Sequence, residues 1–213
     1  MDKDTSKKRT NNRIGTKDKR PIVVCISGKA QSGKDTAASM MKACMEEKGY
    51  SVVIIHYADL LKFICTTYFG WNGKKDEDGR TLLQFIGTDV VRTRKPDFWV
   101  NFVSNLLDLF HEAWDYVIIP DTRFPNEIDR LKDAGYLVFH LKLRRPGFDN
   151  CLSQEQQKHI SETALDSISP NYIISNSGAL SDLKKEVESI TEVITMVGRY
   201  YSNGDLITYL RTW

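Results

Sequence analysis

Five short runs of apolar residues are spaced along the chain, separated by longer segments of mixed polarity. The first run, at residues 22–27, contains five consecutive apolar residues, which is typical of a strand buried on both faces, as in a parallel sheet. Four later runs predict further strands, at residues 51–56, 116–120, 136–143 and 172–176. Polar residues that directly follow such strands are the first candidates for a functional site, because open α/β sheets bind ligands at that edge.

Two segments next to these strands have clear helix patterns. Residues 34–47 are predicted to form a helix that ends before Gly49. Residues 180–197 carry an apolar face at helical spacing, which should close over the sheet. The aromatic residues within 198–213 are expected to pack on the same body.

The segment between the second and third strands is long, and residues 70–112 are expected to form a helical insertion. Within it, residues 80–87 predict a short helix that Gly87 ends. Apolar side chains at helical spacing in residues 98–107 predict a core helix, for which Asp97 is the expected cap.

A glycine-rich loop directly follows the first strand and leads into the first helix. Strand, glycine loop and helix form the context of a phosphate-binding P-loop, in which backbone N–H groups meet the anion and Lys34 reaches the β- and γ-phosphates. Asp35 departs from the pattern, which has Ser or Thr at that position, and a plain strand–turn–helix junction is the alternative. The context favours a nucleotide-phosphate site that comprises Gly28, Lys29, Ala30, Gln31, Ser32, Gly33, Lys34, Asp35 and Thr36.

Charged residues follow three other strands. Asp59 follows the second strand, either as a helix cap or as a carboxylate at the ligand-binding edge. Asp121 follows the third strand, where a carboxylate can hold Mg²⁺ directly or through water, and Arg123 would face the same crevice. Arg144 and Arg145 follow the fourth strand, as a clamp on phosphates or as solvated charges.

Composition indicates a soluble globular protein of one domain. The chain has 213 residues, and its net charge of +2 is too small to indicate nucleic acid or a membrane as the main partner. No apolar run approaches the ~18 residues of a membrane span, and no signal-peptide pattern opens the chain. The four cysteines form no CxxC pair, so we expect free thiols in a reducing cytoplasm. Residues 1–20 are basic and predict a disordered tail, with loose attraction to nucleic acid as the alternative.

Taken together, the motifs resemble those of the bacteriophage-type deoxynucleoside monophosphate kinases, within the P-loop nucleoside monophosphate kinase superfamily. The resemblance covers roughly residues 21–190, and its most specific part is the run from Asp121 to Glu127. A loop similar to residues 28–35 also occurs in animal phosphomevalonate kinases, which leaves the substrate open. The matching segments are residues 28–36, 57–62, 83–88 with Arg92, 97–100, 121–127, 159–162 and 172–176.

The resemblance implies a three-layer α/β/α P-loop kinase fold with a five-stranded parallel sheet. A single kinase domain would span residues 21–213, with residues 70–112 as the monophosphate-binding region and residues 146–165 as a lid. The polar composition of the segment after the fourth strand suits such a lid. The implied partners are ATP and a deoxynucleoside monophosphate, and a homodimer is left open.

The implied reaction transfers the ATP γ-phosphoryl group to the monophosphate, which requires positioning and charge neutralisation rather than covalent catalysis. Lys34 would follow the moving charge, and Asp35 and Asp121 would hold Mg²⁺ or its waters. Arg123, with Arg92, would grip the acceptor phosphate. Arg144 and Arg145 would close on the γ-phosphate, and the implied substrate-side residues also include Asp59, Lys62 and Trp99.

Two other functions compete with this one. The first is a kinase for another phosphorylated small molecule, such as phosphomevalonate. The second is a P-loop ATPase or nucleotide switch that acts on a macromolecule. Against a switch, the chain has no Asn-Lys-x-Asp guanine motif, and against a motor it shows no second domain to move.

Overall fold

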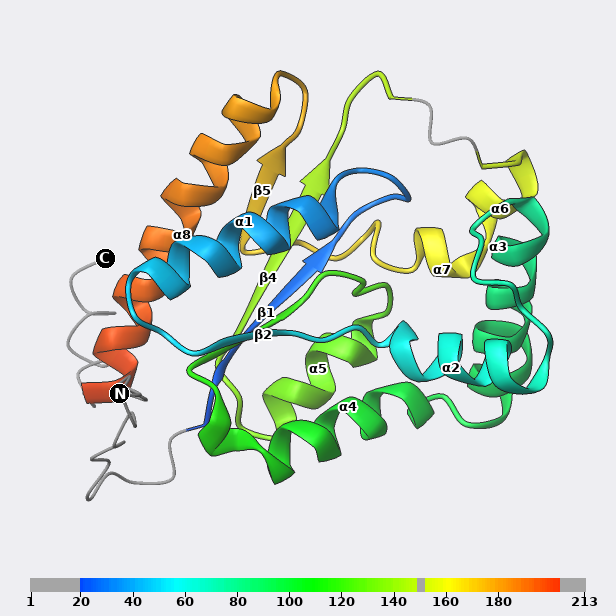
Figure 1. The fold of residues 1–213 in the computed structure, drawn as a ribbon, viewed down its shortest axis with the longest axis horizontal. Helices are drawn as coiled ribbons and strands as arrows, with labels where there is room; N and C mark the ends of the chain where they lie inside the picture. The colour runs from blue at the N-terminus through cyan, green and yellow to red at the C-terminus, as the bar shows by residue number, and fades with distance from the viewer. Residues whose placement is uncertain (1–19, 149–151, 204–213) are drawn as a thin grey trace, which may run out of the picture.

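The computed structural model describes residues 20–148 and 152–203, and its centre is a five-stranded sheet (Figure 1). The strand order is β2-β3-β1-β4-β5, and every neighbouring pair is parallel. The predicted five-stranded parallel sheet is therefore confirmed. Its strands are β1 (Ile22–Ser27), β2 (Val52–Ile54), β3 (Tyr116–Ile119), β4 (Val138–Arg144) and β5 (Tyr172–Ser175).

Helices cover both faces of the sheet and complete the three layers (Figure 1). Alternate residues of β1 face opposite layers: Val24 belongs to the core under α1 and α8, whereas Val23 belongs to the core under α4 and α5. Because both faces are buried, β1 needs apolar residues at consecutive positions, as its sequence shows. The covering helices are α1 (Lys34–Glu47) and α8 (Leu180–Asn203) on one face, and α4 (Phe98–Leu109) and α5 (Pro125–Asp133) on the other.

Helix α1 has the predicted bounds, and α8 is longer than predicted. The buried side of α8 is formed by Leu183, Val187 and Ile194, whereas Leu180 and Val193 are 63% and 43% exposed. None of the helices in the described part of the chain combines the length and hydropathy of a membrane span.

Two predictions concern residues that the structure does not describe. The predicted basic tail falls on residues 1–19 apart from its last residue, and residues 204–213 make up most of the aromatic C-terminal segment. Both stay predictions.

The predicted insertion is present as a helical unit at one end of the sheet, beside α2 (Figure 1). Its own small core contains Leu61, Cys65, Trp71, Ile86 and Trp99. Together with α2 (Ala58–Tyr68), the unit consists of α3 (Glu77–Gln84) and the π-helix η1 (Phe85–Arg92), whereas the short 3₁₀ helix η2 (His111–Ala113) lies outside it and leads into β3.

The prediction that Gly87 ends a helix is wrong, because α3 continues into η1 through that glycine. A Cβ atom at Gly87 would lie 2.6 Å from Leu61 Cδ2 on α2. The carbonyl of Gly87 also accepts a hydrogen bond of 2.9 Å from Trp99 Nε1. Gly87 therefore permits close helix packing rather than a helix stop.

The core helix predicted after Asp97 is confirmed as α4, but its cap is not. Asp97 occupies the cap position without a capping hydrogen bond. Its carboxylate instead accepts a hydrogen bond of 2.8 Å from Asn126 Nδ2, which joins the start of α4 to α5. The helix buries Trp99 and Val103, whereas Phe102 is 41% exposed.

We expect Gly87→Ala to destabilise the protein by about 1–3 kcal/mol, because the added methyl group must displace Leu61. In a Leu61→Ala background, the same change should be neutral or stabilising, since alanine favours a helix over glycine by ~1 kcal/mol. Urea unfolding of the four proteins measures both effects. Equal destabilisation in the two backgrounds would contradict the packing role of Gly87.

A second prediction concerns His140 on β4, which is buried with its Nε2 2.7 Å from Ser27 Oγ. Burial, and then the nearby charge of Lys142, lowers the pKa of His140 to about 4. The unfolded chain, with a histidine pKa of about 6.5, therefore binds a proton between these values that the folded protein excludes. Stability should fall as pH falls through this window, by up to ~1.4 kcal/mol per pH unit.

The measurement is the free energy of unfolding of the parent and of His140→Gln between pH 4 and pH 8. The variant has no titrating group at this position, so its stability should fall less steeply with acid. Parallel curves for the two proteins would contradict the assignment.

Candidate functional site at the carboxyl edge of the sheet

The glycine loop between β1 and α1 is shaped by close backbone contacts. Gly28 and Gly33 have φ angles of 145° and 102°, and Gln31 is also left-handed at 59°. A Cβ atom on Gly28 would lie 2.4 Å from the Leu143 carbonyl oxygen, so only glycine fits there. At the end of the loop, Gly33 caps α1 without a side-chain hydrogen bond, which leaves the first N–H groups of α1 to a ligand.

The interior of the loop offers polar groups to an anion. Among the described residues, Ser32 Oγ is a buried side-chain atom without a hydrogen-bond partner. Lys34 Nζ donates to the carbonyls of Gly28 and Lys29, at 2.8 and 2.7 Å. Burial, followed by the charge of Arg123, lowers the pKa of Lys34 to about 8. These groups suit a phosphate, whose oxygens would meet a hydroxyl and an ammonium.

Asp121 binds the start of α2. Its Oδ1 accepts the Tyr57 N–H and its Oδ2 accepts the Ala58 N–H, both at 2.9 Å. Asp59 is therefore not the cap of this helix, because it lies one residue inside α2 and accepts the His56 N–H at 3.2 Å. The carboxylate that satisfies the helix start comes from another strand, which a local pattern cannot reveal.

His56 was not predicted as a site residue, although it is the last residue of the predicted strand 51–56 and therefore lies at its carboxyl end. Its Nε2 lies 3.0 Å from Asp35 Oδ1, and its Nδ1 lies 3.4 Å from Asp59 Oδ2. The hydrogen bond from His56 lowers the pKa of Asp35, and the same bond raises the pKa of His56. Lys62 Nζ binds Asp59 Oδ1 at 2.9 Å, so that Lys62 is also part of this set of charged contacts.

Arg123 is held by two groups on α7 (Ile160–Thr163). Its Nη1 donates to the Ser161 carbonyl at 2.9 Å and forms an ion pair with the carboxylate of Glu162. The other oxygen of Glu162 accepts the Ala30 N–H of the glycine loop at 3.1 Å. Glu162 thus joins Arg123 to the loop. The sequence signal for Glu162 was the segment 159–162, which is one of the segments that resemble the kinase family.

Arg92 is held by a second buried carboxylate, Glu127, which was also not predicted as a site residue. Arg92 forms an ion pair with Glu127 and lies 4.0 Å from the centre of the Phe124 ring. Glu127 also accepts the backbone N–H of Arg123, at 2.6 Å. Burial raises the pKa of Glu127 to about 7, while the charge of Arg92 acts in the opposite direction.

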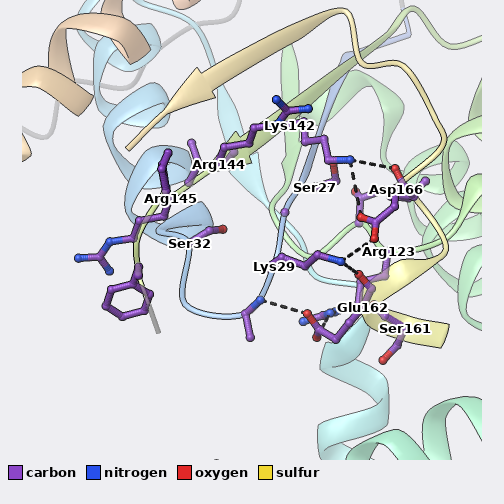
Figure 2. A pocket seen from close by; sticks show the side chains of 17 residues that line it. Ser27, Lys29, Ser32, Arg123, Lys142, Arg144, Arg145, Ser161, Glu162 and Asp166 are labelled. Carbon is purple, nitrogen blue, oxygen red and sulfur yellow. Dashed lines mark hydrogen bonds and ion pairs between the residues drawn. The ribbon is translucent and has the colours of Figure 1, made fainter. Parts of the chain in front are cut away.

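Two cavities of about 470 and 460 Å³ flank the glycine loop. The first, shown in Figure 2, lies between the loop, the end of β4 and the residues that follow α7. The second lies between the loop and the helical insertion. Four residues line both cavities and therefore separate them: Ala30, Arg123, Ser161 and Glu162.

The second cavity brings together most of the predicted site residues. Trp99, one of them, is only 3% exposed and mainly supports the wall through its hydrogen bond to Gly87. Gly33, Thr36 and Asp59 line neither cavity. The predicted residues around the second cavity are Ala30, Gln31, Lys34, Asp35, Lys62, Arg92, Trp99, Asp121 and Arg123.

Arg144, the last residue of β4, and Arg145 do not form a clamp here. Both line the first cavity, but Figure 2 shows their side chains pointing away from each other. Arg145 lies 3.7 Å from the centre of the Phe148 ring, and its Nη1 lies 3.3 Å from the Gln31 carbonyl oxygen.

The part of the chain that the structure describes has no cluster of three or more His, Cys, Asp or Glu side chains that could hold a metal ion. The carboxylates of Asp35 and Asp121 nevertheless line the same cavity.

The strand order and the glycine loop after β1 define the P-loop kinase fold. A solved structure, that of the protein APE1195, supports the fold alone. It matches at a TM-score of 0.51 and 14% identity, over 84% of this chain and 98% of that protein.

Residues 54–187 match the family of deoxynucleotide monophosphate kinases, and the chain belongs to that family. The deoxynucleotide monophosphate kinase of Enterobacteria phage T4 is 32% identical over 117 residues, which are 54% of this chain and 46% of that protein. The kinase of Escherichia phage RB69 is 32% identical over 113 residues, 52% of this chain and 43% of that protein. The chain therefore spans about half the length of these phage relatives.

A protein of Acanthamoeba polyphaga mimivirus, named a putative deoxynucleotide monophosphate kinase, is 26% identical over 199 residues. That match covers 80% of this chain and 96% of the mimivirus protein.

Proposed function

We propose that this protein transfers the γ-phosphoryl group of ATP to the phosphate of a deoxynucleoside monophosphate, yielding ADP and the diphosphate. Membership of the family supports this reaction. The geometric observation that carries it is one cavity of about 460 Å³, which is lined by both the P-loop lysine Lys34 and the arginines Arg92 and Arg123. A donor phosphate on the loop would there meet an acceptor phosphate held by the arginines.

ATP would bind with its phosphates on residues 28–36. The first N–H groups of α1, the unpartnered hydroxyl of Ser32 and the ammonium of Lys34 would surround the phosphate oxygens. Lys34 is well suited to follow the transferred group, because its ammonium already lies beside the Gly28 and Lys29 carbonyls of the loop.

The monophosphate would occupy the second cavity, whose volume is within the ~300–1,000 Å³ of typical small-molecule sites. Arg123 would bind the acceptor phosphate, and Arg92 would add a second positive charge. Buried carboxylates already orient both guanidiniums. The entropy cost of fixing the two arginine side chains on substrate binding would therefore be small. The insertion, residues 70–112, would enclose the nucleoside through Arg80, Leu83, Gln84 and Thr88.

The residues present also fit Mg²⁺. This ion keeps several waters and takes one or two carboxylates besides the substrate phosphates, so a dedicated cage of three acidic residues is not needed. Asp35 and Asp121 line the cavity beside the loop, and the side chain of Asp35 is 76% exposed and can hold water. Bound there, the ion would neutralise charge on the phosphates.

Residues 146–165 would act as the lid. Their described helices, α6 (Gln154–Lys158) and α7, already touch both the loop and the insertion: Gln156 Nε2 donates to Thr81 Oγ1 at 3.2 Å, and Glu162 contacts Ala30. With the lid in contact with the loop, Arg144 and Arg145 would act on the γ-phosphate and water would be excluded, which prevents wasteful hydrolysis of ATP.

We place the activity in the cytoplasm, because Cys25, Cys44 and Cys65 are free thiols and suit a reducing compartment. The fourth cysteine, Cys151, lies outside the described residues. The homodimer stays a prediction.

The direct test is a coupled ADP-release assay with dGMP, dTMP, dAMP, dCMP, their ribonucleotide forms and phosphomevalonate. We expect ATP turnover to require a deoxynucleoside monophosphate. Turnover without any acceptor would indicate an ATPase, and turnover with phosphomevalonate alone would indicate the other small-molecule kinase.

For Arg123→Ala, we expect kcat/KM for the monophosphate to fall by ~10²-fold or more, because a charge-assisted contact of about 3 kcal/mol is lost. ATP affinity should change little. Arg130→Ala is a matched control, since Arg130 is an exposed arginine on α5. Weakened ATP binding with an unchanged KM for the monophosphate would contradict the assignment.

For Asp35→Asn, we expect weaker binding of MgATP but equal or tighter binding of metal-free ATP. A carboxylate beside the triphosphate is favourable only when a divalent cation compensates its charge. Nucleotide titrations with Mg²⁺ and with EDTA measure the difference. His56→Gln is the control, because it removes the imidazole partner of Asp35 and keeps the carboxylate. Equal weakening with and without metal would assign Asp35 a structural role at the start of α1.

A further inference from the structure

The P-loop and Arg123 come from different parts of the chain and are joined through Glu162. The loop follows β1 and Arg123 follows β3, whereas Glu162 lies on α7. One carboxylate oxygen of Glu162 accepts from Arg123 Nη1, and the other accepts from the Ala30 N–H at 3.1 Å. Figure 2 shows Glu162 between the loop and Arg123. A single side chain therefore contacts both groups.

The charge of Glu162 matters as much as its shape. Its side chain is only 4% exposed, so its interactions are weakly screened. Burial, followed by the charge of Arg123, lowers the pKa of Lys34, and the charge of Glu162 acts in the opposite direction. Without the carboxylate, Arg123 would keep only its hydrogen bond to the Ser161 carbonyl among its contacts to α7.

The backbone of α7 is itself anchored, which makes Glu162 a fixed support. The Glu162 carbonyl accepts a hydrogen bond of 2.5 Å from Lys29 Nζ, and the Ser161 carbonyl accepts one of 2.9 Å from Arg123. On the other side, the His159 ring caps α7 and lies 3.3 Å from Asp89 of η1. The helix is thus held between the loop and the insertion.

Arg123 keeps donors for a ligand in this arrangement. Its Nη1 is used on α7, whereas its Nη2 and Nε have no hydrogen-bond partner among the described residues. Its side chain is 29% exposed and borders both cavities. The contacts to α7 therefore select one orientation of the guanidinium and leave its other edge available.

We propose that Glu162 is a positioning residue for phosphoryl transfer. It orients Arg123 toward the acceptor phosphate and joins Arg123 to the P-loop at Ala30. Glu162 acts through Arg123 and does not itself touch the substrate. The inference rests on the proposed function, because Arg123 has this role only if a monophosphate occupies the second cavity.

The test is Glu162→Gln, an uncharged side chain of the same size. With a monophosphate that the parent phosphorylates, we expect about tenfold weaker binding in calorimetry without ATP, and a similar rise in KM. ATP affinity should stay within about twofold, since the Lys34 and α1 contacts remain. In an Arg123→Ala background, Glu162→Gln should cause no further loss, because its partner is already absent.

Asp166→Asn is the matched control. Asp166 binds Lys29 Nζ at 2.8 Å and follows α7, but no contact joins it to Arg123 among the described residues. This variant removes a neighbouring carboxylate that also binds the loop, and it should bind the monophosphate as the parent does. Thermal unfolding of each variant verifies that it is folded.

Three results would overturn the inference in a parent that is active. In the first, Glu162→Gln binds the monophosphate as tightly as the parent does. In the second, Glu162→Gln loses ATP affinity and monophosphate affinity equally. In the third, Glu162→Gln weakens monophosphate binding as much in the Arg123→Ala background as in the parent. A parent that neither binds nor phosphorylates any deoxynucleoside monophosphate would instead refute the proposed function, and the inference with it.

Discussion

Parallel pairing of β1 with both β3 and β4 is the constraint on which the site depends. Because the three strands run in the same direction, their carboxyl ends meet at one edge, where the glycine loop, Asp121 and Arg144 emerge together. Helices bury both faces of the sheet, so these strands have no freedom to shift in register. A rigid sheet can therefore hold loops of different origin at separations that phosphoryl transfer requires.

Two buried carboxylates hold side chains of the site, as the sheet holds its backbone. Glu127 holds Arg92, and Glu162 holds Arg123. Buried ion pairs gain little net stability, since removing both charges from water costs about as much as their attraction returns. Their proposed benefit is orientation, because both arginines line the second cavity while paired with these carboxylates. The same carboxylates keep several cations close together without mutual repulsion separating them.

The segment that we propose as the lid contacts the insertion through polar groups. Gln156 bonds to Glu77 and Thr81 on α3, and His159 contacts Asp89 on η1. Polar contacts of this kind exchange with water at small net cost, whereas Leu165 is buried in the core and joins the segment to the body at its carboxyl end.

The sequence by itself determined the five strands, the bounds of α1, the glycine loop and the placing of Asp121 and Arg123 at the ligand-binding edge. These features follow from periodicity and turn chemistry within a few residues, where local patterns are informative. Only the tertiary structure decided that Asp121, not Asp59, caps α2, that Gly87 packs against Leu61, and that Glu162 joins Arg123 to the loop. The pairs Asp121–Ala58 and Arg123–Glu162 are 63 and 39 residues apart in the chain. Contacts at such separations depend on how whole elements pack, which local patterns do not specify.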